Sequence, residues 1–147
     1  MATGLQPAQD KGRPFLSHTI LLVDDSQLVR HALRSSLEVN PDWVICGEAS
    51  DGQSAIQLTQ DLKPDLVLLD LSMPGMNGFQ VARELKRISP SLPLLMFTSF
   101  KTPQLEKEAM AAGCNAVVSK SDHHDRLFDN IYQLLARKDR NIGARIA

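Results

Sequence analysis

Residues 64–78 read PDLVLLDLSMPGMNG, and this stretch decides the fold. An unbroken apolar run at 66–69 lies between Pro64 and Pro74, which is typical of a short strand buried on both faces of a parallel sheet. The run ends at Asp70, and a buried carboxylate is costly unless another group neutralises it. The segment after it has to turn. Asp70 is therefore predicted at the carboxyl end of an inner strand, the edge at which open α/β sheets bind ligands.

Strand and helix patterns alternate along the rest of the chain. Strands are predicted at 19–23, 43–46, 66–69, 92–97 and 115–119, and helices at 28–37, 55–62, 81–88, 103–112 and 122–138. Apolar residues at helical spacing, such as Leu28, Leu33 and Leu37 in the first helix, give each helix a face to bury. The short connections predict an α/β fold, a parallel sheet covered by helices on both faces with right-handed crossovers.

Several residues indicate where helices begin and end. Ser26 and Thr102 are suited to cap the first and fourth helices, with Pro103 at the first helical position. Gly113 is a natural stop for the fourth helix. Met110, on that helix, is assigned to the core rather than to a binding surface.

Composition limits the class of protein. Residues 1–18 and 138–147 lack periodic patterning and are predicted as flexible tails around a single domain at 19–137. Sixteen basic and seventeen acidic residues leave a net charge of -1, without the basic excess of nucleic-acid-binding proteins. No apolar run approaches the roughly 18 residues that span a membrane. Cys46 and Cys114 are too few for a disulfide framework and indicate a reducing cytoplasm.

Polar residues fall where the predicted strands end. Asp24 and Asp25 follow the first strand, Asp70 ends the third, Thr98 follows the fourth, and Lys120 follows the fifth. Taken singly, each would most simply be a turn, capping or surface residue. In a parallel sheet, however, the carboxyl ends of all strands meet at one edge. The joint occurrence of these residue types therefore predicts one site.

The chemistry of such a site follows from its charges. Three clustered carboxylates repel one another, so a proton or a cation should join them. Mg²⁺ is the expected cation because it takes hard oxygen ligands together with phosphate oxygens. Asp70 would be the nucleophile that forms an aspartyl-phosphate. Lys120 and the metal would neutralise the transferred group, and Thr98 would donate a hydrogen bond to it.

These residues resemble the receiver domain of bacterial two-component response regulators. The matching segments are ILLVDD at 20–25, PDLVLLDLSMP at 64–74, Asn77-Gly78, Thr98-Ser99, Ala112-Gly113 and Lys120. The resemblance implies a flavodoxin-like, doubly wound five-stranded sheet of order 2-1-3-4-5. It also implies that a histidine kinase or phosphotransfer protein phosphorylates Asp70. Asp24, Asp25, Asp70 and the Ser72 carbonyl would bind Mg²⁺, and Thr98 and Lys120 would contact the phosphoryl group.

Residues 40–52 look like the subgroup whose receivers usually precede a helix-turn-helix DNA-binding domain. Only ten residues follow Arg137 (147-137), too few for that module, so a stand-alone receiver and a piece of a longer transcription regulator both stay open. Val117 occupies the position of the family's usual aromatic switch. Ser121 replaces the usual proline after Lys120, so a trans bond is expected there because a non-proline cis bond costs about 2.5–4 kcal/mol.

The resulting expectation is a phosphorylation-dependent signalling switch that modifies only its own Asp70 and is otherwise no enzyme. Phosphorylation would shift a pre-existing equilibrium in the fourth helix, fifth strand and fifth helix, which an output partner or domain reads. A phosphorylation-dependent homodimer stays open, and no direct contact with nucleic acid or membrane is expected. Phe100 suits either core packing or partner contact. The alternatives are an interaction module that no longer uses phosphate, motivated by Val117 and Ser121, and a small-molecule phosphatase, for which the chain lacks length.

Overall fold

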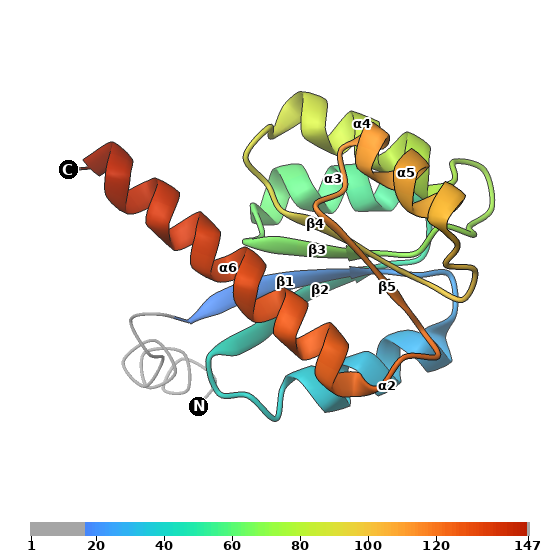
Figure 1. Cartoon of the computed structure of the whole chain (residues 1–147), viewed down its shortest axis with the longest axis horizontal. Helices are drawn as coiled ribbons and strands as arrows, with labels where there is room; N and C mark the ends of the chain where they lie inside the picture. The colour runs from blue at the N-terminus through green and yellow to red at the C-terminus, as the bar shows by residue number, and fades with distance from the viewer. Residues whose placement is uncertain (1–16, 147) are drawn as a thin grey trace, which may run out of the picture.

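The computed structural model describes residues 17–146, and describes side chains as far as residue 140. Most of the predicted N-terminal tail therefore lies outside the described residues. Five strands alternate with five helices in the described part of the chain: β1 (His18–Val23), α2 (Gln27–Leu37), β2 (Trp43–Ala49), α3 (Gly52–Leu62), β3 (Leu66–Leu69), α4 (Gly78–Ile88), β4 (Leu94–Thr98), α5 (Pro103–Ala112), β5 (Ala116–Ser119) and α6 (His124–Ile146) (Figure 1). The helix labels begin at α2, so the fourth and fifth helices of the sequence are α5 and α6.

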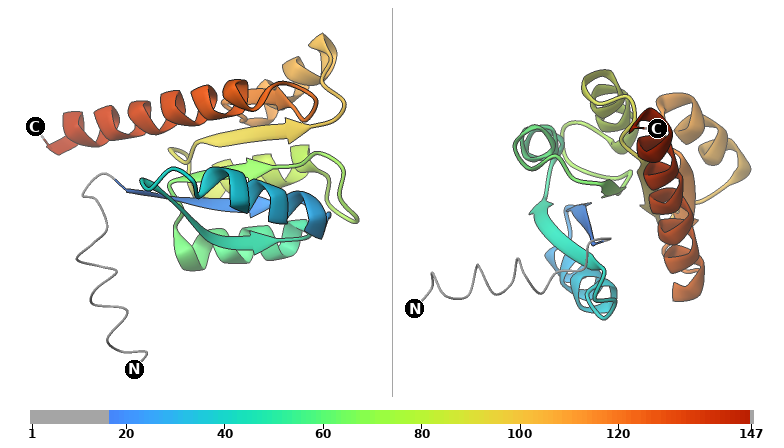
Figure 2. Two further views of the ribbon diagram at one scale, coloured as in Figure 1. Left: turned by 90° about the horizontal axis from the view of Figure 1, so that it is seen from below. Right: turned by 90° about the vertical axis from the view of Figure 1, so that its left-hand side faces the viewer.

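The strands form one parallel sheet of order β2-β1-β3-β4-β5, which confirms the predicted topology. Helices α3, α4 and α5 cover one face of the sheet, and α2 and α6 cover the other (Figures 1 and 2). Strand β3 pairs with β1 on one side and with β4 on the other, and all four of its residues are buried. This central place explains why its sequence is an unbroken apolar run rather than an alternating one.

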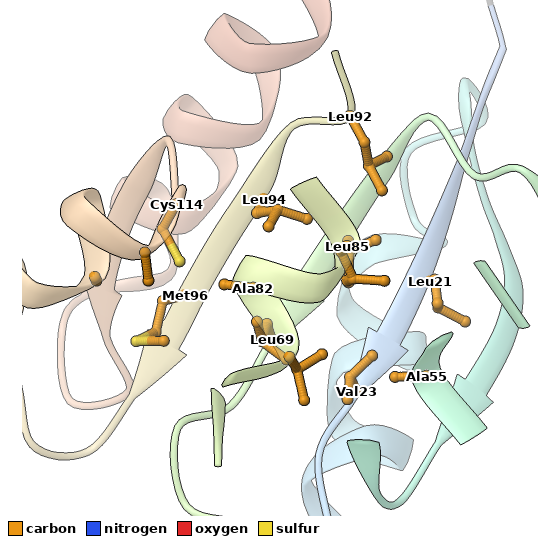
Figure 3. Close-up of a cluster of buried hydrophobic side chains, with 14 of the residues drawn as sticks. Leu21, Val23, Ala55, Leu69, Ala82, Leu85, Leu92, Leu94, Met96 and Cys114 are labelled. Atoms are coloured by element: carbon orange, nitrogen blue, oxygen red, sulfur yellow. The ribbon is translucent and has the colours of Figure 1, made fainter. Parts of the chain in front are cut away.

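Two hydrophobic cores lie on opposite faces of the sheet. In β1, Leu21 and Val23 enter the core beneath α3, α4 and α5, whereas Ile20 and Leu22 enter the core beneath α2 and α6. This alternation is the period of two expected of a strand. Figure 3 shows the first core, in which Leu85 of α4 lies among side chains of the sheet. Full burial of one such leucine contributes roughly 1.5–3 kcal/mol.

The helix ends predicted at Ser26, Thr102 and Gly113 are confirmed. The Ser26 hydroxyl accepts a hydrogen bond from the third residue after it, and the Thr102 hydroxyl does the same at the start of α5. Asn77 caps α4 through a reciprocal capping box with Gln80. Gly113 ends α5 with a left-handed φ of 111°, a conformation that costs glycine little. Each N-cap contributes about 1 kcal/mol.

The C-terminal tail predicted at 138–147 is wrong, because α6 continues as a helix to Ile146. Two polar contacts, at Lys138 and Asp139, link the start of this part of α6 to other segments. The Lys138 ammonium lies 3.5 Å from the Asp65 carboxylate, and the His18 imidazole lies 3.0 Å from Asp139. Such contacts leave no hydrophobic period in the sequence, which is why the helix was predicted to end early.

Two apolar residues predicted to be buried lie at the surface. Leu28 is 78% exposed and Met110 is 50% exposed. In α2 only Leu33 and Leu37 are buried, so the buried stripe is narrower than the apolar pattern of the sequence. No helix within residues 17–146 combines the length and the hydrophobicity needed to cross a membrane.

Candidate functional site

The polar residues predicted at the strand ends meet at the carboxyl edge of the sheet. Asp24 follows β1, Asp70 follows β3, Thr98 ends β4, and Lys120 follows β5. These four strands are consecutive neighbours in the sheet. Asp24, Asp70 and Thr98 are buried, with 3%, 6% and 0% of each residue's surface exposed. The fold therefore places these residues, distant in sequence, at one edge.

The ammonium of Lys120 bridges the two buried carboxylates. Its Nζ atom lies 2.8 Å from Oδ2 of Asp24 and 3.3 Å from Oδ1 of Asp70. The backbone of Lys120 is fixed as well, because its amide donates to the Thr98 carbonyl at 2.8 Å. Lys120 thus reaches from the end of β5 across β4 and β3 to the end of β1.

Burial and neighbouring charges set the protonation of the bridged groups. Burial raises the pKa of Asp70, and the charge of Asp24 raises it further, against the opposing effect of Lys120. Burial alone would lower the pKa of Lys120, but its hydrogen bond to Asp24 and the charges of both carboxylates outweigh burial and raise that pKa. The charged form of Asp70 is therefore disfavoured in the folded protein, because Lys120 compensates only part of the effect of burial and of Asp24.

A third carboxylate completes an acidic cluster. Asp25 is exposed, and one oxygen each from Asp24, Asp25 and Asp70 lie within 4.8 Å of one another. Three carboxylates and one ammonium carry a formal charge of -2 (-3 + 1). Hard oxygen ligands with this net charge suit a divalent cation such as Mg²⁺. Ser72 lies in the exposed loop two residues after Asp70, and a role for its carbonyl as a further ligand stays a prediction.

Glycine is required where α4 begins beside Asp70. The amide of Gly78 donates to the Leu71 carbonyl at 2.8 Å. A Cβ atom on Gly78 would lie 2.5 Å from the Asp70 carbonyl oxygen and 2.8 Å from the Leu71 Cα. This close approach explains the glycine that follows Asn77, and it fixes the backbone of the predicted nucleophile.

The loop after β4 is tied to Thr98. The hydroxyl of Thr98 accepts a hydrogen bond from the Phe100 amide at 3.2 Å, which leaves its own hydrogen free to donate. The Phe100 side chain is 63% exposed, which contradicts core packing and leaves partner contact as the open role. Val117, at the usual aromatic position, is buried with 6% exposed. The described chain contains no cis peptide bond, so the Lys120–Ser121 bond is trans as predicted.

Sequence reasoning missed the groups that hold the backbone of Asp24. The guanidinium of Arg30 donates to the Asp24 carbonyl at 2.6 Å and to the Glu48 carboxylate at 2.9 Å. One signal was available: Arg30 lies in the first turn of α2, where a cation opposes the helix dipole. A residue in an unfavourable position of this kind indicates a local contact, although sequence alone does not identify the partner.

Comparison with known proteins gives the family. Residues 20–132 match the family described as the response regulator receiver domain. The response regulator protein VraR of Staphylococcus aureus is 35% identical over 102 residues, which are 69% of this chain and 49% of VraR. The transcriptional regulatory protein YdfI of Bacillus subtilis is 32% identical over 109 residues, 74% of this chain and 51% of YdfI.

An enzyme is also among the relatives. The protein-glutamate methylesterase/protein-glutamine glutaminase 1 of Methanosarcina mazei is 37% identical over 126 residues, 83% of this chain and 34% of the enzyme. The chain thus spans from about a third to about half of the length of these curated relatives.

Solved structures agree with the fold. A LuxR-family two-component response regulator from Aurantimonas sp. superposes with a TM-score of 0.79 at 31% identity, covering 82% of this chain and 86% of that one. The response regulator domain of CheB from Thermotoga maritima superposes with a TM-score of 0.77 at 25% identity, covering 82% and 97%. The family match covers residues 20–132, which is most of this chain. The chain therefore belongs to the receiver domains of two-component response regulators.

Proposed function

We propose that Asp70 of this receiver domain accepts a phosphoryl group from a phosphohistidine on a histidine kinase or phosphotransfer protein. One observation carries the proposal: the Lys120 ammonium lies between the buried carboxylates of Asp24 and Asp70, beside the third carboxylate of Asp25. In the transfer, an Asp70 oxygen bonds to phosphorus while the bond from phosphorus to the donor imidazole breaks. Covalent transfer of this kind requires a positioned nucleophile and neutralisation of the charge on the phosphoryl oxygens.

Each residue of the site has a role in that transfer. Asp70 is the nucleophile, and transfer converts its carboxylate into an acyl phosphate whose added negative charge must be neutralised by neighbouring groups. Lys120, which is already fixed beside Asp70, neutralises one phosphoryl oxygen, and the free hydroxyl hydrogen of Thr98 donates to another. Asp24, Asp25 and Asp70, with the Ser72 carbonyl, would hold Mg²⁺. When bound, the metal supplies positive charge to the phosphoryl oxygens.

The proposal extends to the wider role of the protein. Phosphorylation would bias the loop after β4, and an output partner or domain would read the surface of α5, β5 and α6. Exposure of Phe100 in that loop and of Met110 on α5 supports this choice of surface. A transcriptional output, a homodimer of the phosphorylated form and a cytoplasmic location are parts of the proposal. It includes no reaction on any group other than Asp70.

Phosphate acceptance is tested by incubating the protein with Mg²⁺ and acetyl phosphate and measuring its intact mass. We expect a gain of one phosphoryl group, which Asp70→Asn and removal of Mg²⁺ both abolish. Asp129→Asn is the matched control, since Asp129 is an exposed aspartate on α6. A gain that survives Asp70→Asn, or no gain at all, would refute the proposal.

A second candidate is an interaction module that works without phosphate. The valine at position 117 and the trans bond after Lys120 favour it, since both depart from the pattern of the family. Such a module would show no thermal stabilisation by Mg²⁺, and its partner binding would be unchanged by Asp70→Asn.

A further inference from the structure

We infer that Arg30 is a positioning residue of the phosphorylation site, which fixes the peptide joining Asp24 to Asp25 and so sets the geometry of both carboxylates. The inference rests on the proposed function, because it concerns the cation-binding acids of that same site. The Arg30 guanidinium is a cation that cannot ligate a metal ion, and it acts on the site through the backbone carbonyl of Asp24.

The inference rests on a short hydrogen bond from Arg30 to the Asp24 carbonyl, which belongs to a network that also contains Glu48 and Arg34. Nη1 of Arg30 donates to the Asp24 carbonyl at 2.6 Å, and Nε donates to Oε1 of Glu48 at 2.9 Å. The other Glu48 oxygen accepts from Arg34 at 2.8 Å. Only 14% of the Arg30 side chain is exposed. The guanidinium is a planar fork of donors, so fixing one end on Glu48 aims the other end at the carbonyl.

The remaining polar groups of Asp24 are also bound. Its amide donates to the Ala49 carbonyl at 3.0 Å, Oδ1 accepts from the Ser26 amide at 2.9 Å, and Oδ2 accepts from Lys120 at 2.8 Å. The carbonyl held by Arg30 belongs to the peptide plane that continues into Asp25. Rotation of this plane would change where the Asp25 side chain begins. Arg30 is therefore the contact that holds the peptide plane between the buried acid and the exposed one.

Arg34 provides a matched control. Arg30 and Arg34 lie one turn apart on α2, carry the same charge and pair with the same Glu48 carboxylate. Only Arg30 also contacts Asp24. Arg30→Gln and Arg34→Gln therefore remove the same charge and an ion pair to the same Glu48. Arg30→Gln also removes the contact to the acidic site, whereas Arg34→Gln also removes an exposed pair with Glu38 at 3.4 Å.

Positioning and simple electrostatics predict opposite results. Arg30 is a cation near a cluster with a formal charge of -2 (-3 + 1), so removing its charge alone would strengthen Mg²⁺ binding, and added salt would screen that gain. Loss of positioning would weaken Mg²⁺ binding at any salt concentration. Arg30→Lys keeps the charge but loses the fork, so under positioning it should behave like Arg30→Gln.

The test is calorimetric titration of the full chain with Mg²⁺ at low and high salt, without any phosphoryl donor. We expect the Kd to rise about tenfold, or about 1.4 kcal/mol, for Arg30→Gln and Arg30→Lys, and to stay within about twofold for Arg34→Gln. At saturating Mg²⁺, phosphorylation by acetyl phosphate should be nearly restored in both Arg30 variants.

Several results would overturn the inference. These are equal Kd values for Arg30→Gln and Arg34→Gln, salt-sensitive tightening in Arg30→Gln, or a wild-type Kd in Arg30→Lys. Unfolding of both Arg30 variants while Arg34→Gln stays folded would assign Arg30 to stability instead. Absence of Mg²⁺ binding by the wild type would overturn the proposed function itself, and this inference with it, which is distinct from failure of the Arg30 variants alone.

Discussion

Replacing Lys120 with methionine should destabilise the protein in a way that Mg²⁺ largely reverses. The ammonium lies 2.8 Å from Asp24 and 3.3 Å from Asp70, and 19% of the lysine side chain is exposed. Methionine keeps most of the apolar stem and removes only the charge. Two buried carboxylates are then left facing each other without compensation.

The magnitude follows from the burial of this pair. Removing one partner of a fully buried ion pair costs about 3–5 kcal/mol, and we expect about 2 kcal/mol here because partial exposure lets water screen the remaining charges. Without the ammonium, Mg²⁺ should bind about tenfold more tightly, which adds about 1.4 kcal/mol of stabilisation at saturation. The deficit in the free energy of unfolding should therefore shrink from about 2 to about 0.6 kcal/mol.

Urea denaturation with and without saturating Mg²⁺ measures both values. The single tryptophan, Trp43, is 4% exposed and reports unfolding by fluorescence. Lys107→Met on α5 is the control, since Lys107 is an exposed lysine whose loss should change stability little in either buffer. If Mg²⁺ stabilises Lys120→Met no more than it stabilises the wild type, Lys120 does not compete with a cation for these carboxylates, and the reasoning fails.

Three further outcomes are expected. Because the pKa of Asp70 is raised in the fold, the unfolded chain loses this proton first as pH rises above about 3.9. The stability of the wild type relative to Asp70→Asn should therefore fall through that range, as urea midpoints of both proteins between about pH 4 and 7 will show. Gly78→Ala forces a Cβ against the Asp70 and Leu71 backbone, so we expect a loss of about 1–3 kcal/mol in thermal unfolding, together with slower phosphorylation by acetyl phosphate. Burial raises the pKa of Cys114 to about 12, so an aromatic disulfide reagent should label it in Cys46→Ser protein only after unfolding, and rapid labelling of that protein in its native state would contradict the burial of Cys114.

The fold could be predicted from sequence because its signals are local. The run at 66–69 indicated a doubly buried strand, and the structure places it as β3 between β1 and β4. Ser26, Thr102 and Gly113 likewise indicated helix ends through their own side chains or backbone preference. The continuation of α6 past Arg137 could not be predicted, because the contacts of Lys138 and Asp139 pair these residues with distant segments.

The members of the site could be predicted, but not the contacts among them. Alternation of strands and helices places Asp70, Thr98 and Lys120 at the carboxyl edge of the sheet, independently of their side-chain conformations. Which carboxylates Lys120 bridges depends on rotamers and distances that only the folded chain defines. The same holds for Arg30, whose partners are a backbone carbonyl and a residue on β2. A sequence pattern identifies residue types. Because every residue has a backbone carbonyl, the sequence does not indicate which carbonyl Arg30 contacts.

The valine at position 117 restricts how a phosphorylated state could be transmitted. Val117 is packed in the core that also contains Met96 of β4 and Ala109 of α5. A valine side chain has no aromatic ring, so it cannot act as a switch that rotates between a buried and an exposed position. The Thr98 hydroxyl, by contrast, already bonds the Phe100 amide, so drawing that hydroxyl toward a phosphoryl group strains or breaks a contact to the exposed loop. Under the proposed function, a change at Asp70 thus reaches the surface through the hydrogen bond from the Phe100 amide to the Thr98 hydroxyl, which takes the place of a rotating aromatic side chain.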